Sequence, residues 1–372
     1  MIQKKHIRTI VRGIAFIGLF GLLAAPTCNQ PFGPTATGSG SPSKILNAFG
    51  DSIAAGYVDS FPPGQTKSYV GFYADQAAAD RGHQIVYQGF TTSGETTPQI
   101  EARMRNNLSQ LREAEFFTWD AGGNDFLDAR GDYYGNCNVG ALDNALDAWR
   151  GDWDDLLDTV ESNVGLTAAS APFIRTMNVY YPNPDQDRAS GCSGQGTRFE
   201  VLLPRLLAAG DYMCSTAEAR GWRCADTIAA MNCREDGAGN PDFDCANKRY
   251  LQNLVDSGIC PRNVTSSAYA SPSIDPNCIR AHLDSTGDWD AFFDPARVVK
   301  NGQTLDLMQG DDTHPNSAGH RRLAGAHHDL GYDDVEGPLV ENTYAQCIDF
   351  EDNDGDGKSD CSDAGCAAFC GQ

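Results

Sequence analysis

An apolar run that ends in a Gly-Asp-Ser turn decides the fold of this chain: residues 44–56 read KILNAFGDSIAAG. The run from Lys44 to Phe49 has the length and composition of a buried strand, and Gly50 marks its end. Similar strand candidates lie downstream and alternate with helical patterns: strands at Gln84–Phe90, Glu115–Ala121 and Phe173–Tyr181, and helices near Val70–Ala79, Gln99–Glu113 and Ala141–Asn163. This alternation predicts an α/β fold with a parallel sheet covered on both faces.

Polar blocks follow the expected strands at the edge where ligands bind in parallel sheets. Asp51 and Ser52 follow the first strand, Gly94 follows the second, and Asn124 follows the third. A fourth block, Asp311-Asp312-Thr313-His314, lies far along the chain. These side chains are therefore expected to meet at one end of the sheet.

The four blocks contain the parts of a nucleophilic site. The Ser52 hydroxyl is a weak nucleophile until a base removes its proton, and His314 is the expected base. Asp311 lies three residues before His314 and would orient its ring, whereas Asp312 is an alternative acid with a less favourable offset. The Ser52 amide, the Gly94 amide and the Asn124 side chain are the expected oxyanion donors.

These motifs, in this order, resemble the SGNH (GDSL-type) hydrolase superfamily of esterases and lipases. The resemblance covers roughly residues 44–331, although Ile53 replaces the leucine that usually follows the nucleophile. It implies a flavodoxin-like three-layer α/β/α sandwich and metal-free hydrolysis of carboxylic esters, with no cofactor for catalysis. It also implies that Ser52, Asp311 and His314 form the catalytic triad, and that Ser52, Gly94 and Asn124 form the oxyanion hole.

The N-terminus reads as an export signal. A basic head precedes an apolar stretch from Gly13 to Ala25 that is short for a membrane span, so residues 1–28 are expected to direct export. Cys28 lies where a lipid-anchored cysteine would lie, although Ala25-Pro26-Thr27 fits that signal poorly; ordinary cleavage that discards Cys28 is the alternative. Residues 29–43 have the composition of a flexible linker.

Net charge and composition limit the kinds of molecule that the chain is expected to bind. The chain has 372 residues with a formal net charge of -22, which argues against nucleic acid as a ligand. A membrane contact is expected only as a tether through Cys28. The expected substrate is a small-molecule, lipid or carbohydrate ester. The expected location is extracellular or in the cell envelope, where cysteines form disulfides.

The hydrolase domain is expected at residues 44–335, with a Cys-rich insertion at about 185–300. Seven of the 13 cysteines lie in the insertion and Cys137 precedes it, and the pairing of these eight stays open. They are Cys137, Cys192, Cys214, Cys224, Cys233, Cys245, Cys260 and Cys278.

A separate Cys- and Asp-rich tail is expected at residues 336–372. Its spacing resembles the Asp-rich calcium loops of extracellular proteins, with an aspartate in place of the usual final glutamate. The expected ligands are Asp352, Asp354, Asp356, Lys358, Asp360 and Asp363. A solvated acidic tail held by disulfides is the alternative. Calcium would be structural here, with no catalytic duty.

Three functions stay open on the sequence. The principal prediction is an exported serine esterase or lipase that forms an acyl-enzyme on Ser52. A carbohydrate O-acetylesterase of the same superfamily would use identical machinery. A calcium-dependent surface binding protein with a silent hydrolase fold is the alternative of another class, and the intact catalytic blocks count against it.

Overall fold

The structure is a computed structural model that describes residues 32–38, 43–58, 64–65, 67–168, 172–182, 184–233, 247–264, 271–292, 307–309 and 313–330. The expected export signal at 1–28 and the Asp-rich tail at 336–372 lie outside these residues. Within the described part of the chain, no helix is both long and apolar enough to cross a lipid bilayer.

The centre of the fold is a six-stranded sheet, ordered β1-β5-β2-β6-β7-β10. Its strands are β1 (Phe32–Thr37), β2 (Ser43–Gly50), β5 (Gln84–Thr91), β6 (Phe116–Trp119), β7 (Phe173–Met177) and β10 (Arg223–Ala225). Edge strand β1 is antiparallel to β5, and all other pairings are parallel. The five parallel strands have the flavodoxin-like order, so the switch point lies between β2 and β6. The predicted α/β fold class is confirmed.

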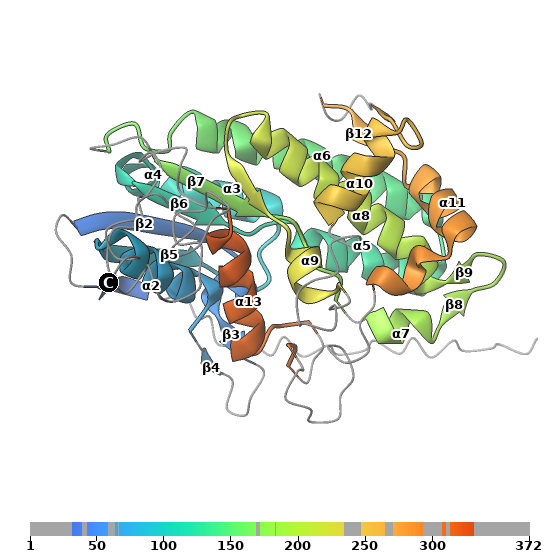
Figure 1. Ribbon diagram of the computed structural model, residues 1–372, viewed down its shortest axis with the longest axis horizontal. Coiled ribbons are helices and arrows are strands. Elements are labelled where there is room, and N and C mark those ends of the chain that lie inside the picture. Colours follow the sequence, from blue (N-terminus) through green and yellow to red (C-terminus); the bar gives the residue numbers. More distant parts are fainter. Residues whose placement is uncertain are drawn as a thin grey trace, which may run out of the picture.

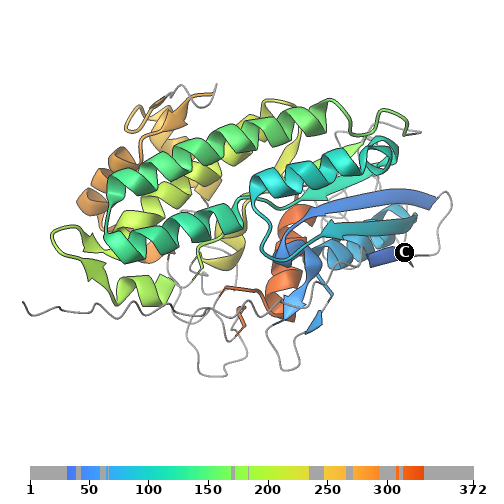
Figure 2. The same cartoon turned by 180° about the vertical axis from the view of Figure 1, so that it is seen from behind.

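Helices cover both faces of the sheet, which Figures 1 and 2 show from opposite sides. One layer contains α2 (Tyr69–Arg81) and α13 (Ser317–His328); the other contains α3 (Thr97–Asn106), α4 (Leu108–Glu113), α6 (Val139–Glu161) and α8 (Arg198–Glu218). Successive side chains of a strand point to opposite faces. Phe116 of β6 therefore packs in the core beneath α2 and α13, whereas Phe117 packs in the core beneath α3 and α6.

The remaining elements are short or lie beside the sheet. The helices are α1 (Ser52–Ala55), α5 (Gly123–Asn136), α7 (Pro184–Arg188), α9 (Thr227–Met231), α10 (Asn247–Asp256), α11 (Pro276–Thr286) and the 3-10 helix η1 (Asp288–Phe292). Three small two-stranded sheets pair β3 (Tyr57–Val58) with β4 (Gly64–Gln65), β8 (Gly191–Cys192) with β9 (Gly196–Thr197), and β11 (Arg262–Val264) with β12 (Ser273–Ile274).

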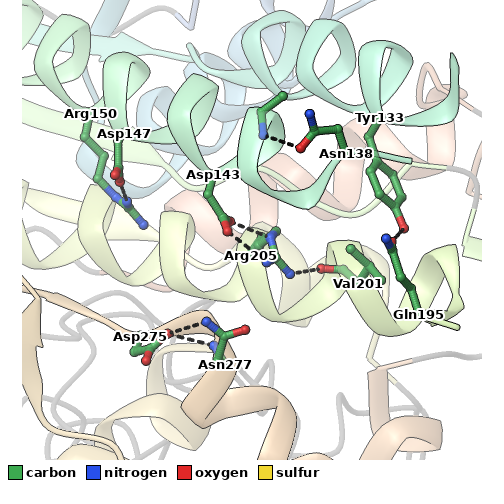
Figure 3. A network of polar contacts seen from close by, with 11 residues as sticks. Tyr133, Asn138, Asp143, Asp147, Arg150, Gln195, Val201, Arg205, Asp275 and Asn277 are labelled. Atoms are coloured by element: carbon green, nitrogen blue, oxygen red, sulfur yellow. Dashed lines mark hydrogen bonds and ion pairs between the residues drawn. The ribbon is translucent and has the colours of Figure 1, made fainter. Parts of the chain in front are cut away.

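An ion pair between buried Arg205 and partly exposed Asp143 joins the two longest helices of the described residues. Arg205 of α8 bonds both carboxylate oxygens of Asp143 on α6, at 2.7 and 3.2 Å, and also donates to the Val201 carbonyl at 2.7 Å (Figure 3). The planar, forked guanidinium lets the buried Arg205 cation form hydrogen bonds to groups on α6 and α8 at the same time. Helix α8 is thereby fixed against the α6 layer.

Two expectations about chain organisation differ from the structure. Within the expected linker at 29–43, Phe32–Thr37 forms strand β1. Its proline and glycine suggested a flexible tether, but the edge position tolerates a residue without a backbone N–H. Within the expected insertion at 185–300, Arg223–Ala225 forms β10, the last parallel strand of the central sheet. A strand of three residues has no apolar run to reveal it. The other domain boundaries stay predictions.

Three disulfides join described residues: Cys137–Cys192, Cys214–Cys224 and Cys260–Cys278. The first ties the end of α5 to β8, and the second ties α8 to β10. None of these six cysteines lines the cavity described below. These disulfides therefore link helices and strands of the fold and are not part of the cavity wall.

Candidate active site

The expected nucleophile lies in a tight turn at the end of β2. Asp51 caps α1 by accepting a hydrogen bond from the Ile53 amide at 2.9 Å, and Ser52 is the first helical residue. Gly50 leaves the room that this turn requires, because a Cβ there would lie 1.6 Å from Oδ1 of Asp120. The strand, the glycine and the cap together fix the Ser52 side chain at the switch point of the sheet.

The structure brings Ser52 and His314 into direct contact. The Ser52 Oγ and His314 Nε2 atoms are 2.8 Å apart, across 262 positions of sequence. This is the distance over which a general base can remove a hydroxyl proton. Ser52 is 6% exposed and lines the cavity described below.

Backbone and side-chain contacts hold the segment that carries His314. An isolated bridge pairs Met308 with Pro315, and the Gln309 amide donates to the His314 carbonyl at 2.8 Å. The Gln309 side chain donates to the carbonyls of Tyr57 and Pro315, at 2.6 and 2.7 Å. Gln309 thus connects the histidine segment to the end of the nucleophile turn.

Two tyrosines flank the same histidine segment. The Tyr57 ring lies 4.6 Å from the His314 ring, centroid to centroid. The Tyr180 hydroxyl donates to the Thr313 carbonyl at 2.6 Å. Both contacts restrict how far the His314 ring can move away from Ser52.

Gly94 and Asn124 lie at the same cavity. Gly94 has a φ of 82°, in the left-handed region that glycine adopts without strain, and no atom lies within 4 Å of where its Cβ would be. Backbone conformation, rather than crowding, is therefore the reason for a glycine there. The Asn124 side-chain amide donates to Asp51 Oδ2 at 2.8 Å and to the Glu95 carbonyl at 2.9 Å. Both of its amide hydrogens already have acceptors.

A cavity of about 470 Å³ opens over these residues. Ser52, Gly94, Asn124 and His314 all line it. The rest of the wall includes apolar side chains from several elements: Ile53, Tyr57, Leu127, Met177, Val179, Tyr180 and Pro182. Such a site combines a few converging polar groups with an apolar wall, which is typical of small-molecule pockets.

Two adjacent carboxyl groups lie beneath the nucleophile turn. Burial raises the pKa of Asp51, although a hydrogen bond from Asp120 opposes the change. Burial also raises the pKa of Asp120 well above its ordinary value, and the neighbouring Asp51 charge raises it further. Asp125, the residue after Asn124, lies apart from these carboxyl groups. It accepts hydrogen bonds from the amide and the hydroxyl of Thr97, both at 2.9 Å, and so ties α5 to α3.

Several predicted site residues lie outside the described part of the chain. They are Asp311 and its alternative Asp312, and the expected calcium ligands Asp352, Asp354, Asp356, Lys358, Asp360 and Asp363. Their roles stay predictions. Among the described residues, no group of three or more histidine, cysteine, aspartate or glutamate side chains is placed to hold a metal ion.

A model of the GDSL-like lipase/acylhydrolase family matches residues 48–238. The match covers more than half of the chain and begins within β2. The chain belongs to this family. Membership in this family supports ester hydrolysis as the class of reaction. No relative is found among curated protein sequences.

Solved structures similar to this GDSL-family chain include three enzymes. The lipase Lip_vut3 from a goat rumen metagenome has 15% identity and a TM-score of 0.49, over 78% of this chain and 98% of that chain. The lipase/acylhydrolase from Enterococcus faecalis has 13% identity and a TM-score of 0.37, over 76% and 92%. Axe2, an acetylxylan esterase from Geobacillus stearothermophilus, has 20% identity and a TM-score of 0.32, over 67% and 97%. The substrates of these enzymes are not assigned to this chain.

Sequence reasoning missed three residues that shape this GDSL-family site. Asp120 ends an apolar strand, and a lone aspartate in that place has no distinguishing pattern. Gln309 lies five residues before His314 in a segment without periodicity. Tyr57 follows Gly56 directly after the serine block, so its closeness to the nucleophile was the one available signal.

Proposed function

We propose that this protein is an exported serine hydrolase that cleaves carboxylic esters through an acyl-enzyme on Ser52. The observation that carries the proposal is the 2.8 Å contact between Ser52 Oγ and His314 Nε2 at an apolar-walled cavity. A protein that only binds its ligand does not need a serine hydroxyl in contact with a histidine ring at the wall of a cavity of this size. The proposal goes beyond family membership because it assigns the reacting atoms.

In the acylation step, His314 Nε2 takes the proton from Ser52 Oγ as this oxygen attacks the ester carbonyl carbon. The carbonyl π bond breaks and leaves a tetrahedral oxyanion. His314 then gives the proton to the leaving alkoxide, the alcohol departs, and Ser52 carries the acyl group. Water repeats the sequence with His314 as base, which releases the acid and restores the Ser52 hydroxyl.

The oxyanion would lie near the amides of Ser52 and Gly94 and the Asn124 side chain. Asn124 donates to Asp51 and to the Glu95 carbonyl. For Asn124 to act as the third donor, one of these hydrogens must be shared with the oxyanion. Donors held in place before the reaction are worth about 10²- to 10³-fold in rate each. Asp311 is proposed to accept from the other nitrogen of His314.

We infer that the acyl group enters the apolar part of the cavity. Leu127 of α5, Met177 at the end of β7, and Val179 and Pro182 after it form an apolar wall. An acetyl group alone would leave this wall largely unfilled. Buried apolar contact favours acyl chains by about 0.8 kcal/mol per methylene group. This wall favours an aliphatic esterase over the carbohydrate O-acetylesterase.

The place of action is proposed to be outside the cytoplasm. The three disulfides between described residues support this, because such bonds persist in oxidising compartments. The basic and apolar leader at 1–28 supports it as well. Anchoring through Cys28 and calcium binding by the tail remain separate proposals with no role in the reaction.

The proposed function is tested by hydrolysis of p-nitrophenyl acetate, butyrate, octanoate and palmitate. We expect Ser52→Ala to lower kcat by about 10⁴-fold or more, whereas the matched control Ser109→Ala, exposed on α4, keeps the wild-type rate. Butyrate or octanoate should give the highest kcat/KM. A maximum at acetate would favour the O-acetylesterase, and equal rates for wild type and Ser52→Ala would reject the serine mechanism.

The acyl site is tested separately with Leu127→Trp, which adds bulk to the apolar wall. We expect kcat/KM for octanoate to fall relative to acetate, since the longer chain meets the new ring. Leu166→Trp is the matched control, because Leu166 is 63% exposed and does not line the cavity. An unchanged ratio in folded Leu127→Trp would place the acyl chain elsewhere.

A further inference from the structure

Two buried aspartates meet under the nucleophile turn. Asp51 follows β2 and Asp120 follows β6, so they lie on neighbouring strands at the switch point. Their exposed fractions are 3% and 4%. Adjacent amides bind the two carboxyl groups, Ile53 N–H to Asp51 at 2.9 Å and Ala54 N–H to Asp120 at 3.3 Å, so the two groups lie side by side. A hydrogen bond between two carboxyls requires a proton on one of them.

The hydrogen-bond partners indicate which carboxyl carries the proton. Asp51 accepts from the Ile53 amide at 2.9 Å and from the Asn124 side chain at 2.8 Å, so its oxygens are suited to a negative charge. Asp120 accepts only a longer bond, from the Ala54 amide to Oδ2 at 3.3 Å, among the described residues. Its Oδ1 atom is buried with no donor in the described structure. Ionised Asp120 would leave that oxygen unsatisfied, which is costly in a buried place.

The surroundings oppose a second negative charge at this point. Glu95 adds a negative charge near Asp51, and the Arg103 guanidinium pairs with Glu95, with Nε and Oε2 2.9 Å apart. Burial raises the pKa of the Tyr69 hydroxyl well above its ordinary value, and the charges of Asp120 and Asp51 raise it further, so Tyr69 stays neutral. A proton on His314 would favour the charged form of Asp51. Two ionised carboxylates side by side and buried repel one another strongly.

We propose that Asp51 and Asp120 share one proton, with Asp120 as the neutral donor and Asp51 as the single anion that holds the Ser52 turn and the Asn124 amide in place. Asp120 is then a positioning residue, because it touches no reacting atom and acts through Asp51. Gly50 belongs to the same arrangement, since only a residue without Cβ leaves space for the Asp120 carboxyl. The role in catalysis rests on the proposed function, but the shared proton does not.

The proton is tested by infrared difference spectroscopy, which needs no turnover. At neutral pH, wild type minus Asp120→Asn should show the carbonyl band of a protonated carboxylic acid. The matched control is Asp128→Asn, because Asp128 is exposed on α5. Wild type minus this control should show carboxylate bands instead. Carboxylate bands in the Asp120→Asn difference would overturn the proposal.

The positioning role is tested by kinetics of the same variants. Asp120→Asn keeps a neutral donor to Asp51, so kcat should stay within about 3-fold of wild type. Asp120→Ala removes the donor, and its kcat should fall about 10-fold or more, with KM little changed, since a lost buried hydrogen bond is costly. A kcat of Asp120→Asn as low as that of Asp120→Ala would overturn the positioning role. If Asp120→Ala does not fold, a large loss of kcat in Asp120→Asn alone would overturn it. Failure of Ser52→Ala to lose activity would reject the proposed function while leaving the infrared result intact.

Discussion

The Ser52 hydroxyl meets His314 because neighbouring groups that do not react hold both residues. Asp51 caps the serine turn, and Gln309 joins the histidine segment to the Tyr57 carbonyl. A general base loses much of its effect when it moves by about 1 Å, so these contacts bear directly on the proposed rate. In the proposed mechanism, the placement of Ser52 and His314 therefore depends on backbone carbonyls and a glutamine as much as on the pair itself.

Gln309→Ala is expected to lower kcat by about 10- to 100-fold, because the His314 segment loses its side-chain links to Tyr57 and Pro315. KM for p-nitrophenyl butyrate should change little, since Gln309 does not line the cavity. The control is Gln186→Ala at an exposed position of α7. A folded Gln309→Ala variant with wild-type kcat would show that the backbone bridge alone positions His314.

That Ser52, Gly94, Asn124 and His314 lie together could be predicted from sequence, and the residues that support them could not. Ser52, Gly94, Asn124 and His314 belong to short motifs whose order along the chain carries information. Asp120 and Gln309 act through contacts made only after distant segments meet. No local pattern distinguishes such residues from ordinary polar residues. Asp120 in particular gains its role from the absence of a side chain at Gly50.

Helix α13 shows how one element serves both the site and the core. Asn316 caps its N-terminus by accepting from the amides of Ala318 and Gly319, at 2.8 and 3.1 Å, two residues after His314. Its buried face includes His320, Leu323, Ala324 and His327, at helical spacing. Burial lowers the pKa of His320 to about 4 and that of His327 to about 3. Both histidines are therefore neutral in the folded protein at neutral pH.

Acid is expected to destabilise the protein through these two histidines. Unfolding returns each pKa to about 6.5, so below that pH the unfolded chain binds more protons, and the free energy of unfolding falls as pH drops towards about 4. His327→Phe, which keeps a ring against Tyr69 and Tyr73, should reduce this slope by up to about 1.4 kcal/mol per pH unit. Urea unfolding between neutral pH and pH 4 measures it.

His328 of the same helix provides the control, with the opposite sign. Hydrogen bonds to Asp329 and Asp80 raise its pKa to about 10. Its contribution to stability is therefore fully present below about pH 6.5 and is lost as pH rises towards 10. His328→Gln should alter stability on the alkaline side and leave the acid slope as in wild type. If His327→Phe leaves the fall of the free energy of unfolding between neutral pH and pH 4 unchanged, this would contradict the assignment of the acid destabilisation to the buried histidines of α13.

The elements that sequence patterns revealed are those with strong local signals. Leu142, Leu146, Trp149 and Trp153 repeat on one face of α6, and its helical pattern was predicted within a few residues of the observed Val139–Glu161. Strand β10 reads Arg-Cys-Ala and exists because β7 offers a parallel edge. Strand β1 contains Gly33 and Pro34 and owes its form to pairing with β5. Tertiary pairing, rather than local preference, determined both strands.

Across the whole molecule, disulfides supplement the packing of the helices and the sheet. Cys137–Cys192 closes 55 residues of sequence, whereas Cys214–Cys224 closes 10. A longer closed loop removes more freedom from the unfolded chain. The long-range bridge also joins α5, which begins beside Asn124, to the β8–β9 hairpin.

Removal of the long-range bridge by Cys137→Ser with Cys192→Ser should lower the free energy of unfolding by about 2–4 kcal/mol. The pair Cys214→Ser with Cys224→Ser should cost less, because its loop is shorter. Activity on p-nitrophenyl butyrate at low temperature should persist in both, since none of these cysteines lines the cavity. Urea denaturation measures the difference, and a larger loss from the short loop would contradict the loop-length argument.

The central claim is that Ser52 is the nucleophile and His314 its base. Its most direct test is covalent labelling with a fluorophosphonate, followed by mass spectrometry of the peptides. We expect one adduct, on Ser52, which is absent in Ser52→Ala and forms at least about 100-fold more slowly in His314→Ala. An adduct on a different residue, or equal labelling rates in wild type and His314→Ala, would contradict the proposed mechanism.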